Sequence, residues 1–293
     1  MRIYRYPGET KRLDAEVRAL AHGSYVKLSN GITHYELTGP ETGQVVVLIH
    51  GFSIPYQIWD PLFDPLVKAG FRVLRYDLYG RGTSDRPQVP YNQDLFDIQL
   101  EELLTVLRLT PPVDLIGLSM GGCVSVVFCD RHPDFVRKLV LIDPAGFSMN
   151  FPILVKLVTA PLLGELVFCL LGRKMFISSI AKGYYGEGQY PEYIDVAYQQ
   201  MEFQGYRQAL LSTLRNGVLS DNSGSYSRVG KQEKPSLLIW GTRDRAVPFH
   251  TNNKVREAIP QIEFHAVDNV GHVPHYECPS VVTPIILEFL RRE

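Results

Sequence analysis

The sequence of 293 residues is poor in cysteine, and its cysteines form no recognisable motif. The four are Cys123, Cys129, Cys169 and Cys278, and none lies in a C-x-x-C pair, so the sequence indicates neither a zinc site nor a dithiol redox centre. We interpret them as reduced, mostly buried thiols. The N-terminus, residues 1–18, also lacks the apolar segment of a secretory signal. Together these absences predict a cytoplasmic protein.

The chain also lacks an excess of charge and a long uninterrupted apolar run. Its net charge is −1 at pH 7, which gives no electrostatic footprint for a nucleic-acid partner. The most apolar stretch, 151–172, is interrupted by Lys156, Pro161 and Glu165. A membrane-spanning helix tolerates such residues poorly, so we predict no stable span and expect a pair of helices broken at Pro161.

What the sequence does contain is an alternation of short apolar runs with longer amphipathic ones. The short runs, rich in β-branched residues, predict strands over 24–28, 32–37, 45–50, 71–77, 113–118, 138–143, 236–241 and 262–267. The longer ones predict helices over 60–69, 93–108, 120–131, 206–218, 250–258 and 279–292. This order predicts an α/β fold with a mostly parallel sheet and helices on both of its faces.

The alternation stops between residue 144 and about residue 205, where the apolar runs have a helical character. We therefore predict a core formed by 1–146 and 206–293, and a helical cap, or lid, inserted as 147–205. The segment 220–234 is polar and predicts a loop. Residues 1–23 carry no motif, and the sequence assigns them no role.

The most informative short segment is Gly117-Leu118-Ser119-Met120-Gly121, between a predicted strand and a predicted helix. Ser119 is either an ordinary turn residue or a nucleophile presented on a sharp turn. A tight strand-to-helix reversal crowds the positions two residues before and after its centre, and both positions are glycine here. The carboxyl edge of a parallel sheet is also where ligands bind, which favours the nucleophile.

A serine nucleophile needs a base, and the base needs an acid to orient it. His272 follows the predicted strand 262–267, and Asp244 follows the strand 236–241, so both are expected at the same edge as Ser119. His275 is the rival base, and His265, inside a strand, is interpreted as structural. Asp143 is the alternative acid, because it too follows a strand, and Asp268 is less well placed.

Acyl transfer also requires donors that stabilise an oxyanion. We expect these donors to be the backbone N–H groups of Met120, directly after the nucleophile, and of Phe52, after the strand 45–50. His50 is expected to support the loop of Phe52 by hydrogen bonding, without transferring protons. Cys123, four residues after Ser119 in the predicted helix, is expected to point into packing.

Five motifs in one order carry a family likeness: HGF (50–52), DLYGRGTSDRP (77–87), GLSMGG (117–122), WGTRDRAVP (240–248) and VGHVPHYECP (270–279). Together they resemble the α/β-hydrolase superfamily, in its serine esterase and monoacylglycerol-lipase-like branch with a helical cap. The resemblance implies an eight-stranded sheet, a Ser–Asp–His triad and no cofactor or metal. The serine at 119 argues against dehalogenases and epoxide hydrolases, which are expected to carry aspartate there.

We therefore expect a carboxylic ester hydrolase, acting as a monomer or homodimer on uncharged apolar esters with acyl chains of about C4 to C8. The alternatives are a carbon–carbon hydrolase of vinylogous diketones and a ligand-binding protein on a hydrolase fold. The carbon–carbon hydrolases usually have a glycine-rich segment where this chain reads GFSIPYQIW, which disfavours that alternative. Acyltransferases and perhydrolases share the same triad. Apolar cap residues are expected in part to line the pocket: Phe147, Met149, Phe151, Leu154, Leu157, Leu163, Phe168 and Phe176.

Overall fold

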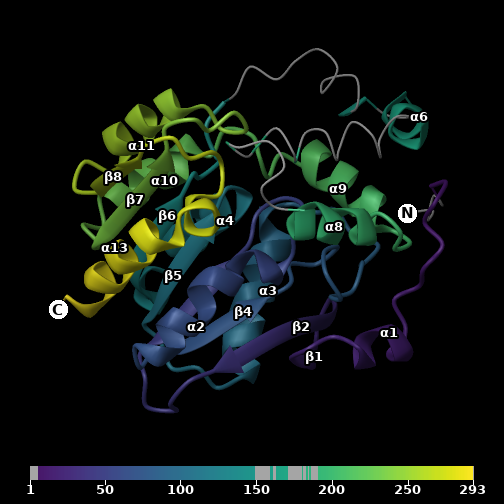
Figure 1. Ribbon diagram of the computed structural model, residues 1–293, viewed down its shortest axis with the longest axis horizontal. Helices are drawn as coiled ribbons and strands as arrows, with labels where there is room; N and C mark the ends of the chain where they lie inside the picture. The colour runs from purple at the N-terminus through teal and green to yellow at the C-terminus, as the bar shows by residue number, and fades with distance from the viewer. Residues whose placement is uncertain are drawn as a thin grey trace.

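A single eight-stranded sheet forms the centre of the protein. The structure is a computed structural model that describes residues 6–148, 159–160, 163–170, 180, 183, 185 and 191–292. The strand order is β1-β2-β4-β3-β5-β6-β7-β8 (Figure 1). β2 pairs antiparallel with both β1 and β4, and all other neighbours are parallel. The predicted fold class is confirmed.

The strands coincide closely with the apolar runs of the sequence. They are β1 Ser24–Leu28, β2 Gly31–Thr38, β3 Val45–Ile49, β4 Arg72–Tyr76, β5 Val113–Leu118, β6 Val136–Ile142, β7 Ser236–Gly241 and β8 Glu263–Val267. β3, β5 and β7 are buried along their whole length, as continuous β-branched runs predict for strands covered on both faces. The edge strands β1 and β8 are only partly buried.

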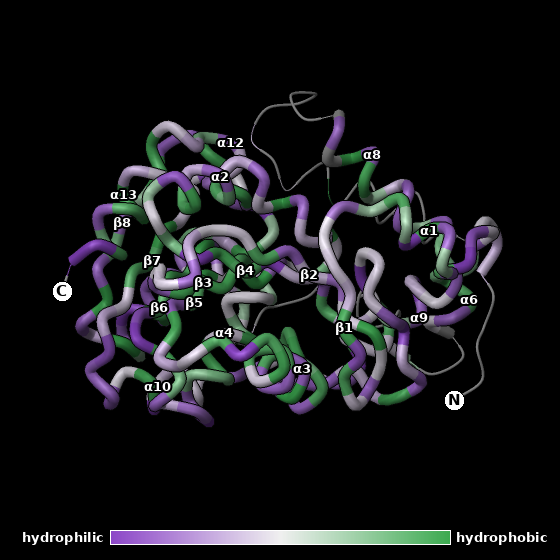
Figure 2. The backbone as a smooth tube through the Cα atoms, turned by 90° about the horizontal axis from the view of Figure 1, so that it is seen from below, coloured by the Kyte–Doolittle hydropathy of each residue, from purple (hydrophilic) through white to green (hydrophobic). Residues whose placement is uncertain are grey.

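Helices cover both faces of the sheet. The helices around the sheet are α2 Asp60–Lys68, α3 Gln93–Val106, α4 Met120–Arg131, α10 Ser223–Gly230, α11 Asn252–Ala258, α12 Pro274–Glu277 and α13 Pro279–Arg291. Figure 2 shows α3, α4 and α10 on one side of the strands and α2, α12 and α13 on the other. Alternate residues of one strand enter the two cores: Val47 and Ile49 face the first, and Val46 and Leu48 face the second.

The expectation that 220–234 is a loop is wrong, because α10 lies within it. Serine and glycine give this segment a weak helical propensity. Its helix is stabilised by packing instead: Tyr226 and Val229 are fully buried, and the Tyr226 hydroxyl donates to the Ala145 carbonyl at 2.5 Å. Tertiary contacts thus override local preference, which a polar sequence pattern does not reveal.

The N-terminal segment, which the sequence leaves without a role, packs against the helices near α9. These are α6 Leu163–Leu170, α8 Pro191–Gln200 and α9 Tyr206–Arg215, and α1 is Ala15–Ala19 (Figure 1). The Glu9 carboxylate accepts the N–H groups of Gly205 and Arg207, both at 3.1 Å, at the start of α9. Tyr6 contacts Phe168 of α6 edge to face, with ring centroids 6.2 Å apart. The segment therefore connects the start of the chain to α6 and α9.

The helices α6 and α8 lie between β6 and β7 in chain order, inside the segment predicted as a cap. The division into core and cap stays a prediction. Of the predicted pocket residues, Phe147 packs on Tyr226 with ring centroids 4.7 Å apart, and Phe168 is buried beside Tyr6. The proposed break at Pro161 and the side chains of Met149, Phe151, Leu154, Leu157, Leu163 and Phe176 lie outside the described residues. No helix within the described ranges has the length and apolar character needed to cross a membrane.

Candidate active site

Ser119 occupies a strained turn between β5 and α4. Its φ of 54° and ψ of −118° lie in a region that side chains other than glycine rarely adopt. The flanking glycines are required by space: a Cβ on Gly117 would lie 2.4 Å from the Gly121 carbonyl oxygen, and one on Gly121 would lie 2.0 Å from the Ile49 carbonyl oxygen. The Ser119 N–H donates to Ile142 O at 2.9 Å, which fixes the turn to β6. The surrounding structure thus holds Ser119 in a conformation that it would not adopt alone.

His272 and Asp244 form a hydrogen-bonded pair. His272 Nδ1 lies 2.8 Å from Asp244 Oδ2, and Asp244 Oδ1 accepts the N–H groups of Ala246 at 2.7 Å and Val247 at 3.0 Å. The Asp244 side chain is inaccessible to solvent, whereas that of His272 is 16% exposed. His272 Nε2 makes no hydrogen bond to any residue in the described part of the chain. The pair therefore leaves one ring nitrogen available for proton transfer.

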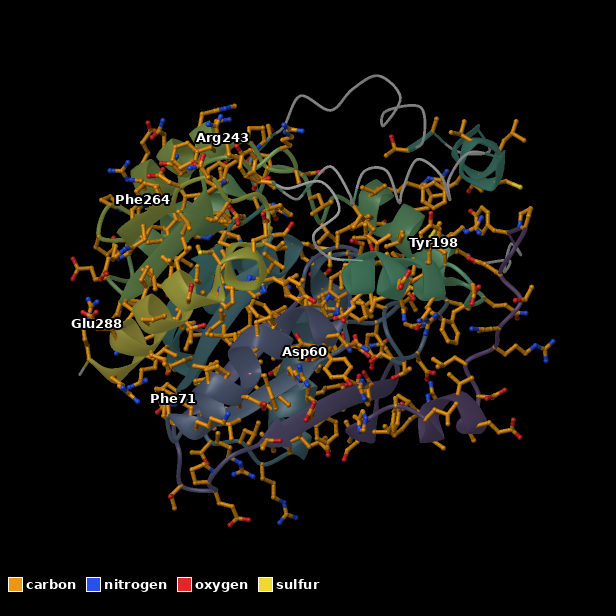
Figure 3. All side chains as sticks on the ribbon, viewed as in Figure 1. Asp60, Phe71, Tyr198, Arg243, Phe264 and Glu288 are labelled. Atoms are coloured by element: carbon orange, nitrogen blue, oxygen red, sulfur yellow. The ribbon has the colours of Figure 1, made fainter. Side chains whose placement is uncertain are left out.

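These residues lie at one edge of the sheet. Ser119, Asp244 and His272 follow β5, β7 and β8, which run parallel. Figure 3 shows Arg243, the residue before Asp244, at the top of the view, and Phe71, at the start of β4, near the bottom. α6 also lies at the top of the same view (Figure 1). The His272 N–H donates to the carbonyl of Gly183, within the inserted segment, so the candidate site borders that segment.

The rival histidines have other roles. His275 is fully buried, its Nε2 bonds to the Ile58 carbonyl at 3.1 Å, and its ring lies 4.5 Å from that of Trp59. Burial lowers the pKa of His275 to about 3, so it stays neutral. His265 bonds to Glu263 at 2.7 Å on the edge strand. Neither has the environment of a catalytic base.

Of the alternative acids, Asp268 is exposed, whereas Asp143 lies beside the pair. One oxygen of Asp143, one of Asp244 and one ring nitrogen of His272 all lie within 4.8 Å of one another. Such residue types can bind a metal ion. Here, however, Asp244 and His272 bond to each other, and the second oxygen of Asp244 already accepts two N–H groups. The contacts fit a hydrogen-bonded histidine–carboxylate pair better than a metal centre.

The loop after β3 approaches the serine. A Cβ on Gly51 would lie 3.4 Å from Ser119 Cβ, so the backbone of this loop borders the nucleophile. His50 supports the loop, since its Nδ1 bonds to the Gly51 carbonyl at 2.8 Å and its Nε2 accepts the Leu78 N–H at 3.0 Å. Burial lowers the pKa of His50 to about 4, which suits this neutral donor–acceptor arrangement. The N–H groups of Phe52 and Met120 donate to no partner within the described ranges.

Arg81 is a further support that the sequence reasoning missed. Its guanidinium is fully buried and donates to Phe52 O at 3.0 Å, Tyr79 O at 3.1 Å and Thr213 Oγ1 at 2.9 Å. Burial lowers its pKa to about 10, which still leaves it charged at neutral pH. Arg81 therefore joins the loop of Phe52 to α9. The signal in the sequence is an arginine between two glycines, Gly80 and Gly82.

Glu277 is a second missed support, on the loop of His272. Its carboxylate accepts the N–H groups of Gly271 at 2.9 Å and Val273 at 3.1 Å, the residues on either side of His272. The His272 N–H donates to the Gly183 carbonyl at 2.9 Å. Three backbone hydrogen bonds thus fix the position of the histidine, and two depend on one carboxylate four residues after Val273.

Cys123 does not compete with Ser119 as a nucleophile. Its thiol is fully buried in α4, with Sγ 3.6 Å from the Val218 carbonyl oxygen and within 3.2 Å of Gln93 Nε2. Burial raises the pKa of Cys123 to about 12, so the reactive thiolate is not populated at neutral pH. The expectation that this side chain points into packing is confirmed.

Comparison with known families gives one clear match. The sequence model described as "Alpha/beta hydrolase family" matches residues 46–284. That range includes all the residues described above for the candidate site.

Individual relatives cover nearly the whole chain at low identity. Lipase 3 of a Moraxella species is 27% identical over 272 residues, which are 92% of this chain and 82% of the relative. A 2-hydroxy-6-oxononadienedioate/2-hydroxy-6-oxononatrienedioate hydrolase of Comamonas testosteroni is 26% identical, over 90% of this chain and 92% of that protein. Among solved structures, a thermophilic esterase from Thermogutta terrifontis has a TM-score of 0.77 and 26% identity, covering 92% of this chain and 98% of its own.

Proposed function

Given that this chain belongs to the alpha/beta hydrolase family, we propose that it is a serine hydrolase that cleaves carboxylic esters through an acyl-enzyme. One observation carries the proposal: His272 is bound through Nδ1 to a buried carboxylate, and its Nε2 stays available at the sheet edge that presents Ser119. That is the arrangement a histidine needs to accept and return a proton.

The proposed mechanism has two half-reactions, and His272 acts first as base and then as acid in each. His272 Nε2 takes the proton of Ser119 as Oγ attacks the ester carbonyl. The N–H groups of Phe52 and Met120 stabilise the oxyanion, and the imidazolium then protonates the leaving alcohol. Water, activated by the same nitrogen, attacks the acyl-enzyme, and His272 then returns the proton to Ser119 Oγ as the acid is released. Asp244 stays ionised, holds the tautomer of His272 and stabilises its cation.

The described surroundings of the site favour an apolar acyl group. Phe52 packs against a cluster of buried residues from the N-terminal segment, α6, the α8–α9 connection and α9, namely Tyr6, Phe168, Met201, Tyr206, Leu210 and Leu211. An uncharged acyl chain next to this cluster loses little solvation and gains contact area. We therefore propose uncharged esters of short-to-medium acyl chain as the substrates, and the similarity to a lipase and an esterase supports this choice.

Carbon–carbon bond hydrolysis is the second candidate, favoured by the similarity to the Comamonas hydrolase. The two reactions are separated by assaying the purified protein with p-nitrophenyl esters, monoacylglycerols and vinylogous diketones. The proposal predicts many turnovers on the esters and little on the diketones. The reverse preference would establish the second candidate, and a single turnover or none on every compound would indicate a binding protein.

A further inference from the structure

A second aspartate lies beside the proposed catalytic acid and has no place in the mechanism above. Asp143 follows β6, is inaccessible to solvent, and accepts the Gly241 N–H at Oδ1 at 3.0 Å. Its φ of 42° lies in the left-handed region, so the turn that aims this side chain at β7 is strained. Oδ2 makes no hydrogen bond of ordinary geometry within the described residues, although it is close enough to Asp244 for the two carboxyl groups to interact.

The two carboxyl groups differ in how well their negative charge is solvated. Asp244 accepts three hydrogen bonds, from Ala246, Val247 and His272, whereas Asp143 accepts one, from Gly241. Hydrogen bonds to a carboxylate favour its ionised form, and two adjacent carboxylates in a dry site disfavour double ionisation. A single proton shared by this pair therefore belongs on Asp143.

The acidic groups around Asp143 act in the same direction. Asp244 comes from the loop after β7, His272 from the loop after β8, and Glu277 from α12. Burial first, and then the negative charge of Asp244, raise the pKa of Asp143 well above its usual range, and Glu277 adds to the rise. His272 bonds to Asp244, and one of its ring nitrogens lies within 4.8 Å of an Asp143 oxygen.

On the basis of this geometry, and resting on the proposed function, we propose that Asp143 is a positioning residue. It keeps its proton, donates it as a hydrogen bond to the remaining lone pair of Asp244 Oδ2, and so holds that carboxylate against His272 Nδ1. Asp244 alone then carries the negative charge of the pair. Asp143 touches neither substrate nor nucleophile, and acts through Asp244.

Two other roles for Asp143 are distinguishable from this one. In the first, it only continues the hydrogen bonding between β6 and β7, because Oδ1 receives the Gly241 N–H as a strand carbonyl would. In the second, it is ionised and serves as the catalytic acid itself. Asparagine and alanine together separate the three. The asparagine amide keeps the acceptor for Gly241 and offers a neutral donor to Asp244, as a protonated aspartate does, whereas alanine provides neither.

The experiment compares Asp143→Asn and Asp143→Ala with the unmodified protein. One readout needs no turnover: NMR of the free protein, following the low-field Nδ1–H proton of His272 and the titration of its ring. The other is the pH dependence of kcat. We expect Asp143→Asn to keep kcat within about threefold, to keep the low-field proton, and to leave the His272 titration unmoved, because the charge of the pair is unchanged. Asp143→Ala should lower kcat by about 10²-fold with little change in KM, and shift or lose the low-field proton.

Three results would overturn the proposal. If Asp143 is ionised, Asp143→Asn removes a negative charge near His272, and the imidazole titration moves to lower pH by about one unit or more. If it is the catalytic acid, Asp143→Asn abolishes turnover. If it only completes the sheet, Asp143→Ala lowers the melting temperature while the low-field proton and the kcat per folded molecule stay the same.

The matched control is Asp114→Asn. Asp114 is equally buried, but it lies in β5 at the opposite end of the sheet, where Arg137 Nε donates to it at 2.8 Å. This variant should lose stability and leave the His272 signals unchanged. Because these signals are recorded without substrate, they test the role of Asp143 even if the protein does not hydrolyse esters.

Discussion

Two histidine–aspartate pairs of the protein have the same hydrogen-bond length but differ in their prospects for catalysis. In the candidate site, His272 Nδ1 lies 2.8 Å from Asp244 Oδ2. In β2, His34 Nδ1 also lies 2.8 Å from an aspartate oxygen, Asp77 Oδ2. The distance between ring and carboxylate therefore does not distinguish a catalytic pair from a structural one.

The second ring nitrogen makes the difference. His34 Nε2 lies 2.6 Å from the His22 carbonyl oxygen, and the side chain has no exposed surface. Both of its nitrogens face acceptors, so both are expected to carry hydrogen, and the ring has no lone pair to receive a proton. The ring of His272 is partly exposed and its Nε2 is available within the described structure. A general base is recognised by this unoccupied nitrogen.

The aspartates differ in the same way. Asp77 accepts the N–H groups of Tyr56 at 3.0 Å and Thr83 at 2.9 Å in addition to His34, and so joins β2, β4 and the loop after β3. Burial opposes its ionisation most strongly, yet the hydrogen bond and charge of His34 outweigh burial and hold the pKa of Asp77 below its usual value. This pair joins elements of the fold, whereas His272–Asp244 is the pair that we propose to react.

The largest expected effect is the loss of activity in Asp244→Asn, for which Asp77→Asn is the matched comparison. Asp244→Asn should lower kcat on p-nitrophenyl butyrate by about 10³–10⁴-fold, because the amide favours the wrong tautomer of His272. Asp77→Asn should change the kcat per folded molecule by only about threefold. Equal losses in both variants, measured at a temperature where both are folded, would contradict the distinction between the pairs.

The same two variants should have the opposite order in stability. Breaking a buried ion pair by removing one charge costs about 3 kcal/mol or more, so Asp77→Asn should lower the free energy of unfolding by about that amount. We expect a much smaller change for Asp244→Asn, because the ring of its partner His272 is partly exposed to solvent. Urea unfolding followed by circular dichroism gives both values. A fully stable Asp77→Asn variant would show that the His34 network does not hold the fold together.

The next largest effect is expected for the preference among acyl-chain lengths. Each methylene buried against the cluster of Phe168 and Tyr206 is worth about 0.8 kcal/mol, so kcat/KM should rise by up to about 10²-fold from acetate to hexanoate. The measurement is kcat/KM along a p-nitrophenyl ester series. A steady fall from acetate onwards would mean that these residues pack among themselves and leave a small pocket.

The pH dependence of stability should also distinguish the pairs. Burial is the largest influence on His34 and lowers its pKa, but the hydrogen bond and charge of Asp77 outweigh it, so the pKa of His34 is raised. A histidine whose pKa is raised by folding stabilises the fold fully below its unfolded pKa of about 6.5. This contribution is lost as the pH rises through the pKa of the folded state. The melting temperature should therefore fall above about pH 6.5. That fall should be absent from Asp77→Asn, and its persistence would assign it to another group.

The smallest effect is expected from thiol modification. Cys123 is only four residues after Ser119, but its thiol is buried and contacts the Val218 carbonyl. Iodoacetamide should therefore leave activity nearly unchanged. The check is residual esterase activity after treatment, with intact mass to count the modified thiols. Inactivation that substrate protects against would place a cysteine at the reacting centre.

The sequence predicts the sheet and the positions of Ser119, Asp244 and His272 well, for a local reason. Strands buried on both faces need continuous β-branched runs, and residues that directly follow parallel strands meet at one edge. Glycine at 117 is likewise a local requirement, because a Cβ there would lie 2.4 Å from the Gly121 carbonyl oxygen. These features depend on short segments, so the sequence of those segments is enough to predict them.

The residues that hold the site in position cannot be predicted in the same way, because they join segments far apart in the chain. Arg81 reaches Thr213, and Glu9 reaches Arg207, across more than a hundred residues each. α10 forms because Tyr226 packs beneath Ala145, although its own sequence is polar. From the sequence alone, polar and charged residues of this kind are predicted to lie in loops or on the surface, because their partners are known only from the fold.

The most direct test of the central claim is labelling with a serine-directed fluorophosphonate, followed by peptide mass spectrometry. The claim that Ser119 is a nucleophile activated by His272 predicts one adduct, on Ser119. It also predicts that labelling is slowed by orders of magnitude in His272→Gln and nearly unchanged in a folded His34→Gln, and that Ser119→Ala is unlabelled. An adduct on another residue, or labelling of Ser119 at the same rate without His272, would contradict it.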